Sequence, residues 1–424
     1  MRSTADESFP LYRGRFVMQR QVLKPLDDAL AQLLQHASVL TQQEEVNTFD
    51  ADGRVLAQDI VSDLQVPPQD NSSMDGYALR CADLLPGATE LPVTQRIAAG
   101  SAGVALSASS AARIFTGAPI PSGADAVIMQ EDCEALPGER VRIKATALPG
   151  QWIRRAGEDI AAGSVILAQG ERLSPAALGL AASVGMSTLA VLRRPRVALF
   201  STGDELVMPG EITPARMKPG SIYNSNRFFL RALLQRLGCQ VSDLGIVPDR
   251  LDATVQALQQ AARGHDLILT SGGVSVGEED HIKPAVQSLG SLDLWQLAIK
   301  PGKPFAYGRV QDAHFIGLPG NPVSSFVTFL LLVRPFLLRL QGARQVAVHS
   351  IAVPAHFTLP KADKRREFLR ARRNAQGGLD LFGNQSSGVL TSAVWADGLV
   401  DNPPGQVIAY GDLVRFIPLM EMLG

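Results

Sequence analysis

The sequence is poor in cysteine. Its 424 residues include three cysteines, Cys81, Cys133 and Cys239, which lie far apart along the chain. An odd number of widely separated cysteines argues against a disulfide framework and against a metal cluster held by thiolates. The simplest interpretation is a reducing compartment, and we predict a cytoplasmic protein.

Neither sign of charge is in excess. Lysine and arginine number 40 against 41 aspartates and glutamates, so the formal net charge is -1. Such a chain has no global positive field that would attract nucleic acid. We therefore expect no nucleic-acid partner, and any anionic ligand must be held by a local site.

Long apolar segments are also scarce. The first ten residues lack the apolar core of a signal peptide, and the longest apolar stretch, about residues 327–338, is interrupted by Arg334 and Pro335. The sequence thus predicts a soluble protein that is not associated with a membrane.

A chain of this length can hold two to four domains, and its pattern changes near Pro195. Beyond that point, short apolar runs alternate with helical segments that end at glycine, which predicts βαβ units and a mostly parallel sheet over residues 193–346. The expected strands are 197–200, 240–247, 266–270 and 292–299, and the expected helices are 226–237, 251–263, 280–289 and one that begins after Asn321-Pro322.

The flanking regions have a different character. Short apolar runs separated by glycine and proline predict a β-rich region over about residues 64–145. Residues 347–424 again show short strands with turn signals, which predicts a small terminal β-barrel or sandwich.

Four loops at the expected strand ends contain the candidate ligand-binding residues. The first is Leu269 to Pro284, LTSGGVSVGEEDHIKP, where Gly272, Gly273 and Gly277 would let the backbone approach a ligand closely. Asp280 is placed to cap the following helix or to hold a cation. A plain turn with an acidic helix cap is the alternative interpretation.

The second loop, Phe200 to Glu205, combines two hydroxyls, a glycine and two adjacent carboxylates. Such groups at a strand end suit a phosphate or a hydrated Mg²⁺, because Mg²⁺ takes oxygen ligands and keeps several waters. Ordinary solvated loop charges would also explain Asp204 and Glu205.

The other two loops suit anions. Lys300 and Lys303 stand in a stiff Lys-Pro-Gly-Lys-Pro segment that could hold an oxyanion or phosphate, although they could equally be surface lysines. In Phe315 to Ser325, Asn321 and Pro322 predict a helix start whose dipole and nearby serines offer an anion site. Because ligands sit at the carboxyl ends of strands in such sheets, the four loops together predict one large polar ligand that carries phosphate.

Seven motifs in one order give the chain a family resemblance. It resembles the molybdopterin molybdenumtransferases, the bacterial MoeA proteins and the gephyrin E domain, over about residues 20–420. The motifs are DNSSMDGYA (70–78), FTGAP (115–119), RAGED (155–159), STGDE (201–205), SGGVSVG (271–277), KPGKP (300–304) and GLPGNP (317–322).

The resemblance implies an elongated homodimer of four domains. These are a discontinuous first domain (1–63 and 146–192), an inserted β-rich domain (64–145), an α/β domain like the molybdopterin adenylyltransferases (193–346) and a small β-barrel (347–424). It implies that adenylylated molybdopterin and molybdate are the substrates, that Mg²⁺ assists the release of AMP, and that the site lies between the third domain of one subunit and the second domain of the other. Other proteins of the cofactor pathway, upstream and downstream, are possible partners.

The resemblance also implies roles for particular residues. Asp75, Thr116, Glu205, Asp249, Asp280 and Lys300 would be catalytic, with Glu205 and Asp280 as metal ligands. The residues expected to bind the substrate are Ser201, Thr202, Gly203, Ser271, Gly272, Gly273, Ser275, Gly277, Lys303, Pro319, Gly320, Asn321 and Pro322.

Some of these residues also fit plainer roles. Asp249 alone predicts a helix N-cap before Leu251, and Asp75 alone predicts a turn aspartate. Gln296 stands where some family members carry a lysine, which puts molybdate affinity in doubt. The arginines of residues 365–373 fit either a solvated basic hairpin or a rim that attracts the phosphorylated pterin.

Two other functions would suit the same resemblance. A non-catalytic scaffold of the gephyrin type would not need Asp75, Glu205, Asp249 and Asp280. A molybdopterin adenylyltransferase would not need the N-terminal half of the chain, and it should survive deletion of residues 64–145.

Overall fold

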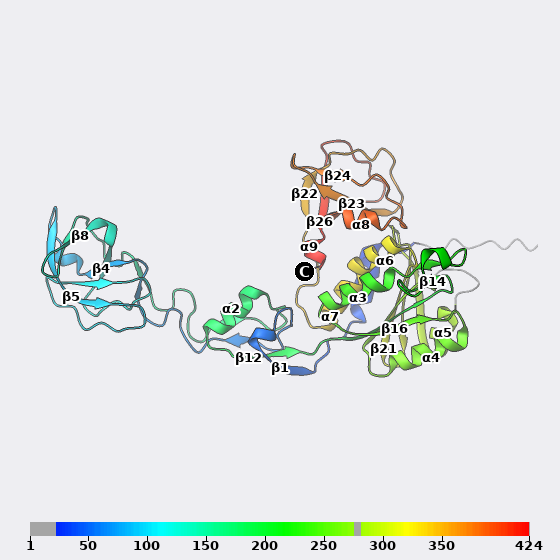
Figure 1. The fold of residues 1–424 in the computed structure, drawn as a ribbon, viewed down its shortest axis with the longest axis horizontal. Coiled ribbons are helices and arrows are strands. Elements are labelled where there is room, and N and C mark those ends of the chain that lie inside the picture. The colour runs from blue at the N-terminus through cyan, green and yellow to red at the C-terminus, as the bar shows by residue number, and fades with distance from the viewer. Residues whose placement is uncertain (1–22, 275–280, 424) are drawn as a thin grey trace, which may run out of the picture. The chain divides into compact units, whose positions relative to one another are not determined.

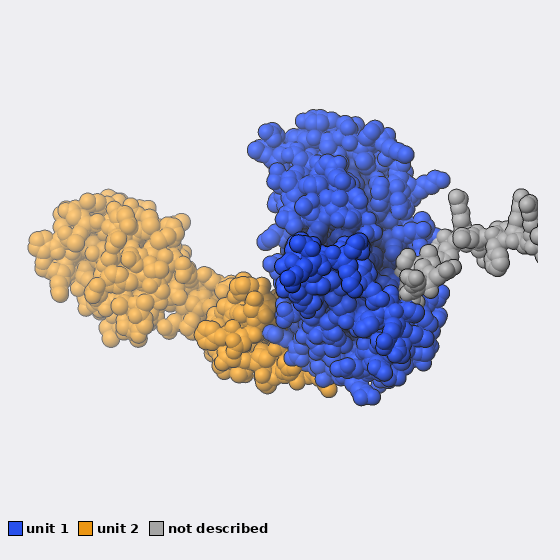
Figure 2. All heavy atoms as spheres, turned by 45° about the vertical axis from the view of Figure 1, so that its right-hand side comes forward, with its two compact units in different colours: residues 1–41, 193–424 blue, residues 42–192 orange. Residues whose placement is uncertain are grey.

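The computed structural model describes residues 23–274 and 281–423. The chain forms two compact units, which Figure 2 shows in different colours: unit 2 is residues 42–192, and unit 1 holds the chain before and after it. The finer division into four domains at the expected boundaries stays a prediction.

Unit 2 is built around a six-stranded sheet with the order β7-β4-β6-β5-β9-β8. Its strands are β4 (Gly76–Leu79), β5 (Thr89–Ile97), β6 (Ala111–Ile114), β7 (Ala126–Met129), β8 (Cys133–Leu136) and β9 (Arg140–Ile143). Alternate residues of β4 face two different apolar clusters, since Tyr77 and Leu79 belong to one and Ala78 to the other. This period of two confirms that the region is β-rich.

The rest of unit 2 consists of short strand pairs and one helix. The pairs are β1 (Gln43–Asn47) with β12 (Thr188–Leu192), β2 (Ile60–Val61) with β11 (Val165–Leu167) and β3 (Asn71–Ser72) with β10 (Ile153–Arg154). Helix α2 (Pro175–Ser183) begins at Ser174, whose side chain accepts a hydrogen bond from the Ala177 amide, and its alanines pack into a separate apolar cluster.

The larger sheet of unit 1 has the order β16-β13-β17-β21-β20-β18. Strands β13 (Arg196–Thr202), β16 (Gln240–Val247), β17 (Leu267–Ser271) and β21 (Ala313–Leu318) are parallel, whereas β20 (Pro304–Val310) runs antiparallel to both of its neighbours, β21 and β18 (Gly290–Gln296). The mostly parallel sheet is thus confirmed. The expected strand 292–299 is corrected to β18 and a separate short strand, β19 (Ile299–Lys300).

Helices cover both faces of this sheet (Figure 1). They are α3 (Asn226–Arg236), α4 (Leu251–Ala262), α5 (Ile282–Leu289), α6 (Pro322–Thr328) and α7 (Arg334–Leu340), with a π-helical turn at Phe329–Val333, while α1 (Leu26–Gln35) precedes unit 2 in the chain. The continuous stretch Pro322–Leu340 is long and apolar enough to cross a membrane, but 83% of it is buried inside the fold, as in a core helix.

The C-terminal part of unit 1 is a closed sheet. Its strands are β22 (Ile351–Pro354), β23 (Arg366–Arg373), β24 (Leu379–Leu381), β25 (Gly398–Asn402) and β26 (Leu413–Pro418), followed by α9 (Met420–Leu423). The hydrogen-bonded order runs β22-β26-β25-β23-β24, and a bridge between Ala355, just after β22, and Leu379 of β24 joins the two ends. This closure confirms the expected small barrel.

Candidate functional site

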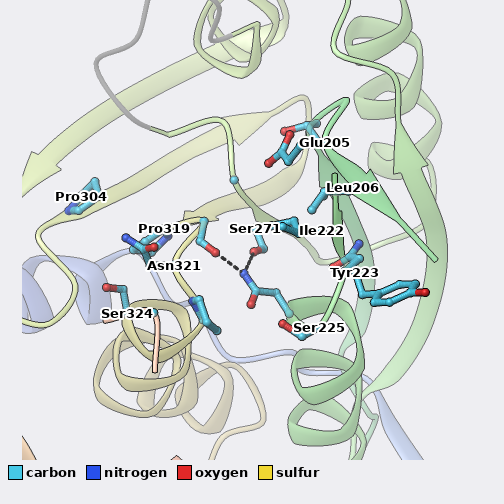
Figure 3. A pocket seen from close by; sticks show the side chains of 17 residues that line it. Glu205, Leu206, Ile222, Tyr223, Ser225, Ser271, Pro304, Pro319, Asn321 and Ser324 are labelled. Carbon is cyan, nitrogen blue, oxygen red and sulfur yellow. Dashed lines mark hydrogen bonds between the residues drawn. The ribbon is translucent and has the colours of Figure 1, made fainter. Parts of the chain in front are cut away.

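A cavity of about 610 Å³ opens at the carboxyl ends of the parallel strands of unit 1 (Figure 3). Strands β13, β17 and β21 end there because each is followed by a glycine-containing loop. Of the residues predicted from the sequence, eight line this cavity: Thr202, Glu205, Ser271, Gly272, Pro319, Gly320, Asn321 and Pro322. Pro304, at the end of the Lys-Pro-Gly-Lys-Pro segment, lines it as well. All four predicted loops therefore contribute to one cavity, as expected for strand ends of a parallel sheet.

Close backbone approach explains the glycines of these loops. Gly272 has a φ of +94°, and a Cβ atom there would lie 2.9 Å from the Thr202 carbonyl oxygen of the neighbouring strand end. Gly203 has a φ of +139°, and a Cβ atom would lie 2.4 Å from a carboxylate oxygen of Glu205. Any side chain at either position would strain the backbone and fill space that the loops use.

Asn226 ties two of the loops together. Its Nδ2 donates hydrogen bonds to Ser271 Oγ and to the Gly320 carbonyl oxygen, both at 2.7 Å, and the side chain is buried. Figure 3 draws these bonds beside the labelled Ser271. No sequence motif indicated this residue, because it begins helix α3 (Asn226–Arg236), away from the glycine-rich loops.

Asn224 is a second cavity residue that no sequence motif indicated. It follows the short strand β15 (Ile222–Tyr223), which pairs with β14 (Leu206–Val207). Its Oδ1 accepts a hydrogen bond from the Arg227 amide, while its buried Nδ2 has no partner in the described part of the chain. A buried amide donor facing a cavity costs free energy unless a ligand or water accepts from it, so Asn224 is a candidate ligand contact.

Lys300 is paired with carboxylates, whereas a lysine that binds an anion was expected to be free of them. Its ammonium lies 2.9 Å from Glu367 and 3.5 Å from Asp363, in the strand pair that β19 makes with β23. Lys303 is exposed and is not among the described residues that line the cavity. The two carboxylates compensate the positive charge of Lys300, so its attraction for an anion is weak.

The first turn of helix α6 has fewer free backbone amides than expected for an anion site. Asn321 is the N-cap and Pro322 occupies the first turn, as predicted, but the Asn321 side chain makes no capping hydrogen bond. The Val323 amide donates to the Ser387 carbonyl oxygen at 2.9 Å, and Gly388, next to Ser387, lines the cavity. The C-terminal barrel therefore contributes a wall of the cavity and uses one of the amides that was expected to face an anion.

Asp249 lies beside the Gly203–Glu205 loop. Its backbone amide donates to Asp204 Oδ1 at 3.2 Å. The alternative interpretation of Asp249 as a helix cap is wrong, because Arg250 is the N-cap of α4 and no side chain caps that helix.

In unit 2, Asp75 and Thr116 are joined directly. The Thr116 backbone amide and hydroxyl donate to Asp75 Oδ1 at 2.7 and 2.8 Å. These two hydrogen bonds, together with the charge of Arg113, lower the pKa of the Asp75 carboxyl below its ordinary value. Asp75 is therefore a carboxylate at neutral pH.

Arg370 on β23 is a buried cation, so the expectation of a solvated hairpin is wrong for this residue. Its Nη1 donates to the Phe368 carbonyl oxygen and its Nε to Ser392 Oγ, at 2.9 and 3.2 Å, but its Nη2 has no partner in the described part of the chain. Burial lowers the pKa of Arg370 to about 10. The Arg370 backbone is bonded to Gln385, two residues before Ser387.

Three predicted residues, Ser275, Gly277 and Asp280, lie outside the described residues. Of the remaining predicted ones, Ser201 is buried at the end of β13 with its hydroxyl unpartnered in the described chain, and Gly273 has a φ of +66° beside Thr202.

Comparison with known proteins places the whole chain in one family. Three family models match in order: the MoeA N-terminal region (domain I and II) over residues 24–185, a probable molybdopterin binding domain over 198–339, and the MoeA C-terminal region (domain IV) over 352–419. A molybdopterin molybdenumtransferase of Haemophilus influenzae is 40% identical over 94% of this chain and 99% of its own length.

The chain belongs to the molybdopterin molybdenumtransferase family.

Further relatives agree with this assignment. A molybdopterin molybdenumtransferase of Bacillus subtilis is 32% identical over 92% of each chain. The crystal structure of a molybdopterin biosynthesis moeA protein from Pyrococcus horikoshii OT3 is similar at a TM-score of 0.80 and 27% identity, over 94% of this chain and 100% of that one. The fold described above is thus a MoeA fold.

We predict that Asn226→Ala will loosen the strand-end loops. It removes both hydrogen bonds that join Ser271 to Gly320 and should lower the free energy of unfolding by about 2 kcal/mol. Hydrogen exchange should show faster exchange at residues 271–273 and 318–320. Gln235→Ala, an exposed change on the same helix, is the control, and equal exchange in both variants would contradict the role of Asn226.

Proposed function

We propose that this protein is a molybdopterin molybdenumtransferase. It takes adenylylated molybdopterin and molybdate, transfers molybdenum to the pterin, and releases AMP. The observation that supports this best is the cavity at the strand ends, lined by the glycine loops, Glu205 and the Asn321-Pro322 helix start, in a chain whose relatives carry this activity in their names. We further propose that the reaction takes place in the cytoplasm.

The cavity suits the phosphorylated pterin. Its lining combines hydroxyl and amide side chains, such as Thr202, Asn224 and Ser324, with backbone at Gly272 and Gly320. These groups donate and accept hydrogen bonds without a fixed charge, so they can hold phosphate oxygens and a polar ring system at the same time.

The donor set also fits Mg²⁺. Glu205 presents an exposed carboxylate at the cavity, and the described residues contain no cluster of three acidic, histidine or cysteine side chains that could hold a metal ion without further ligands. Mg²⁺ is commonly bound by one or two carboxylates together with substrate phosphates and waters, and we assign Glu205 and Asp280 to it. When bound, it would neutralise charge on the phosphoanhydride as AMP leaves.

Arg370 is our candidate for holding molybdate. A buried guanidinium without a carboxylate partner is costly, and an oxyanion would repay that cost through charge-assisted hydrogen bonds. Arg370 does not itself line the cavity, but its backbone amide donates to Gln385, in the segment that reaches the cavity at Gly388. It offers a cation in a protein that has Gln296 where some family members carry a lysine.

We also propose that the protein acts as a homodimer. Asp75 and Thr116 belong to unit 2 and the cavity belongs to unit 1. In the proposed dimer, unit 2 of one subunit supplies these residues to the reaction at the other subunit.

AMP release should depend on molybdate and on the carboxylates. With adenylylated molybdopterin, molybdate and Mg²⁺, the wild type should release AMP and reconstitute a molybdenum enzyme. Glu205→Gln and Asp280→Asn should slow AMP release by about a hundredfold or more, because they remove the proposed metal ligands. Full turnover by either folded variant would reject its assignment, and tight binding without AMP release by the wild type would indicate a scaffold.

Arg370→Gln should raise the molybdate concentration that gives half-maximal AMP release, by about tenfold, while the apparent affinity for the pterin changes little. Arg373→Gln, an exposed change on the same strand, is the matched control. If Arg370→Gln unfolds the protein, Arg370→Lys can be tested in its place, because it retains the positive charge but removes the paired N–H donors of the guanidinium. Unchanged molybdate dependence in a folded Arg370 variant would exclude the role.

Mixed dimers test the shared site. Asp75→Asn and Glu205→Gln homodimers should both be inactive, but subunit exchange between them should recover about a quarter of the wild-type rate per subunit, because half of the subunits form mixed dimers and each mixed dimer has one intact site. Sedimentation should give a dimer in every case. An absence of recovered activity after confirmed exchange would place both residues in the site of a single subunit.

A further inference from the structure

Two arginines of unit 2 meet over one aromatic ring. Arg96 on β5 and Arg113 on β6 are directly paired in the register of these parallel strands. Their guanidinium carbons lie 4.6 and 4.7 Å from the centroid of the Phe115 ring, and that of Arg113 also lies 5.2 Å from the ring of Tyr77. We call Arg96, Arg113 and Phe115 the arginine pair site.

This arrangement costs stability unless something compensates it. Like charges that face each other on neighbouring strands repel. Neither Arg96 nor Arg113 forms an ion pair with any residue that the structure describes, whereas Arg140 and Arg142 of the same sheet both pair with Glu90. Contact with the Phe115 ring offsets part of the repulsion. The two adjacent positive charges therefore have no carboxylate at ion-pair distance among the described residues, although the charge of Arg113 helps to lower the pKa of Asp75.

The two arginines differ in their free donors. Arg113 donates from Nη1 to the Gly76 carbonyl oxygen at 2.9 Å and from Nη2 to Gln130 Oε1 at 2.6 Å, so it is fixed by the sheet. Arg96 is exposed, and its side chain makes no hydrogen bond to the described part of the chain. A guanidinium supported by a ring, with its donors unused, is suited to bidentate recognition of an oxyanion.

The position of the site connects it with Asp75. Phe115 directly precedes Thr116, whose amide and hydroxyl hold the Asp75 carboxylate. The ring that supports Arg96 thus adjoins, along the chain, the residue that holds Asp75, to which the proposed reaction assigns a role.

The charge of the arginine pair site indicates which kind of anion it would bind. Two positive charges match a tetrahedral dianion, and both a phosphate monoester and molybdate are of this kind. We propose that the arginine pair site binds the phosphate of a nucleoside monophosphate, with Arg96 as the main contact. This assignment rests on the proposed function, in which AMP is the leaving product.

Direct binding of AMP to the full-length protein tests the site. Calorimetry without pterin or molybdate should show that Arg96→Gln weakens AMP binding by about tenfold, the loss expected for hydrogen bonds to a charged group. Arg140→Gln, which removes the same charge from another strand of the sheet, should leave the affinity unchanged. Without AMP, Arg96→Gln should melt no lower than the wild type, because it removes the repulsion from Arg113.

Two further measurements locate the bound AMP. Hydrogen exchange should show that AMP protects residues 93–97 and 111–117 in the wild type but not in Arg96→Gln. Phe115→Leu retains both charges and removes the ring, so it should weaken AMP binding and also lower the melting temperature.

The outcomes separate this inference from the proposed function. If the wild type fails to release AMP from the adenylylated pterin but Arg96→Gln still weakens AMP binding, the site stands and the function fails. If AMP release is normal while Arg96→Gln binds AMP as the wild type does, the site is rejected and the function stands. Undetectable binding of millimolar AMP to the wild type, or an Arg96→Gln effect on molybdate alone, would also reject it.

Discussion

The cavity depends on three parallel strands that end at the same edge of one sheet. Each of β13, β17 and β21 delivers a loop to this edge, and backbone groups freed from the ladder must find partners there. The Asn226 side chain donates hydrogen bonds to the loops that contain Ser271 and Gly320. Because Gly272 has no side chain, its backbone can pack closely against the end of β13 at Thr202. The polar groups that remain unpaired, such as Asn224 Nδ2, are the ones that a ligand can use.

The basic residues fall into two kinds, those that form ion pairs with carboxylates and those that do not. Lys300 and Arg366 each meet two carboxylates and hold the barrel to the rest of unit 1, through Glu367 and Asp363 and through Asp401 and Asp27. In contrast, Arg370 is buried without an ion pair to any described residue, and Arg96 and Arg113 face each other without one. A neutralised cation stabilises the fold, whereas an uncompensated cation is retained at a cost that a bound anion can offset.

Sequence patterns predicted much of the fold and part of the site. The run 240–247 matches β16, and the strand-end loops that contain Thr202, Ser271 and Gly320 line one cavity, because apolar periodicity and the topology of parallel sheets fix both. Contacts between residues far apart in sequence could not be predicted. The pairing of Lys300 with Glu367 joins strand β19 to the barrel, Arg370 is bonded to residues of the barrel segment 368–392, and the arginine pair depends on strand register.

The hydrogen bond from the Val323 amide to the Ser387 carbonyl oxygen has a consequence for synthesis. Domains fold as the chain emerges, N-terminal parts first. The strands that form the floor of the cavity are complete once Leu318 has been made, but the wall at Gly388 comes from the last tenth of the chain. A nascent chain on the ribosome therefore has an unfinished cavity, which is completed only when translation is nearly over.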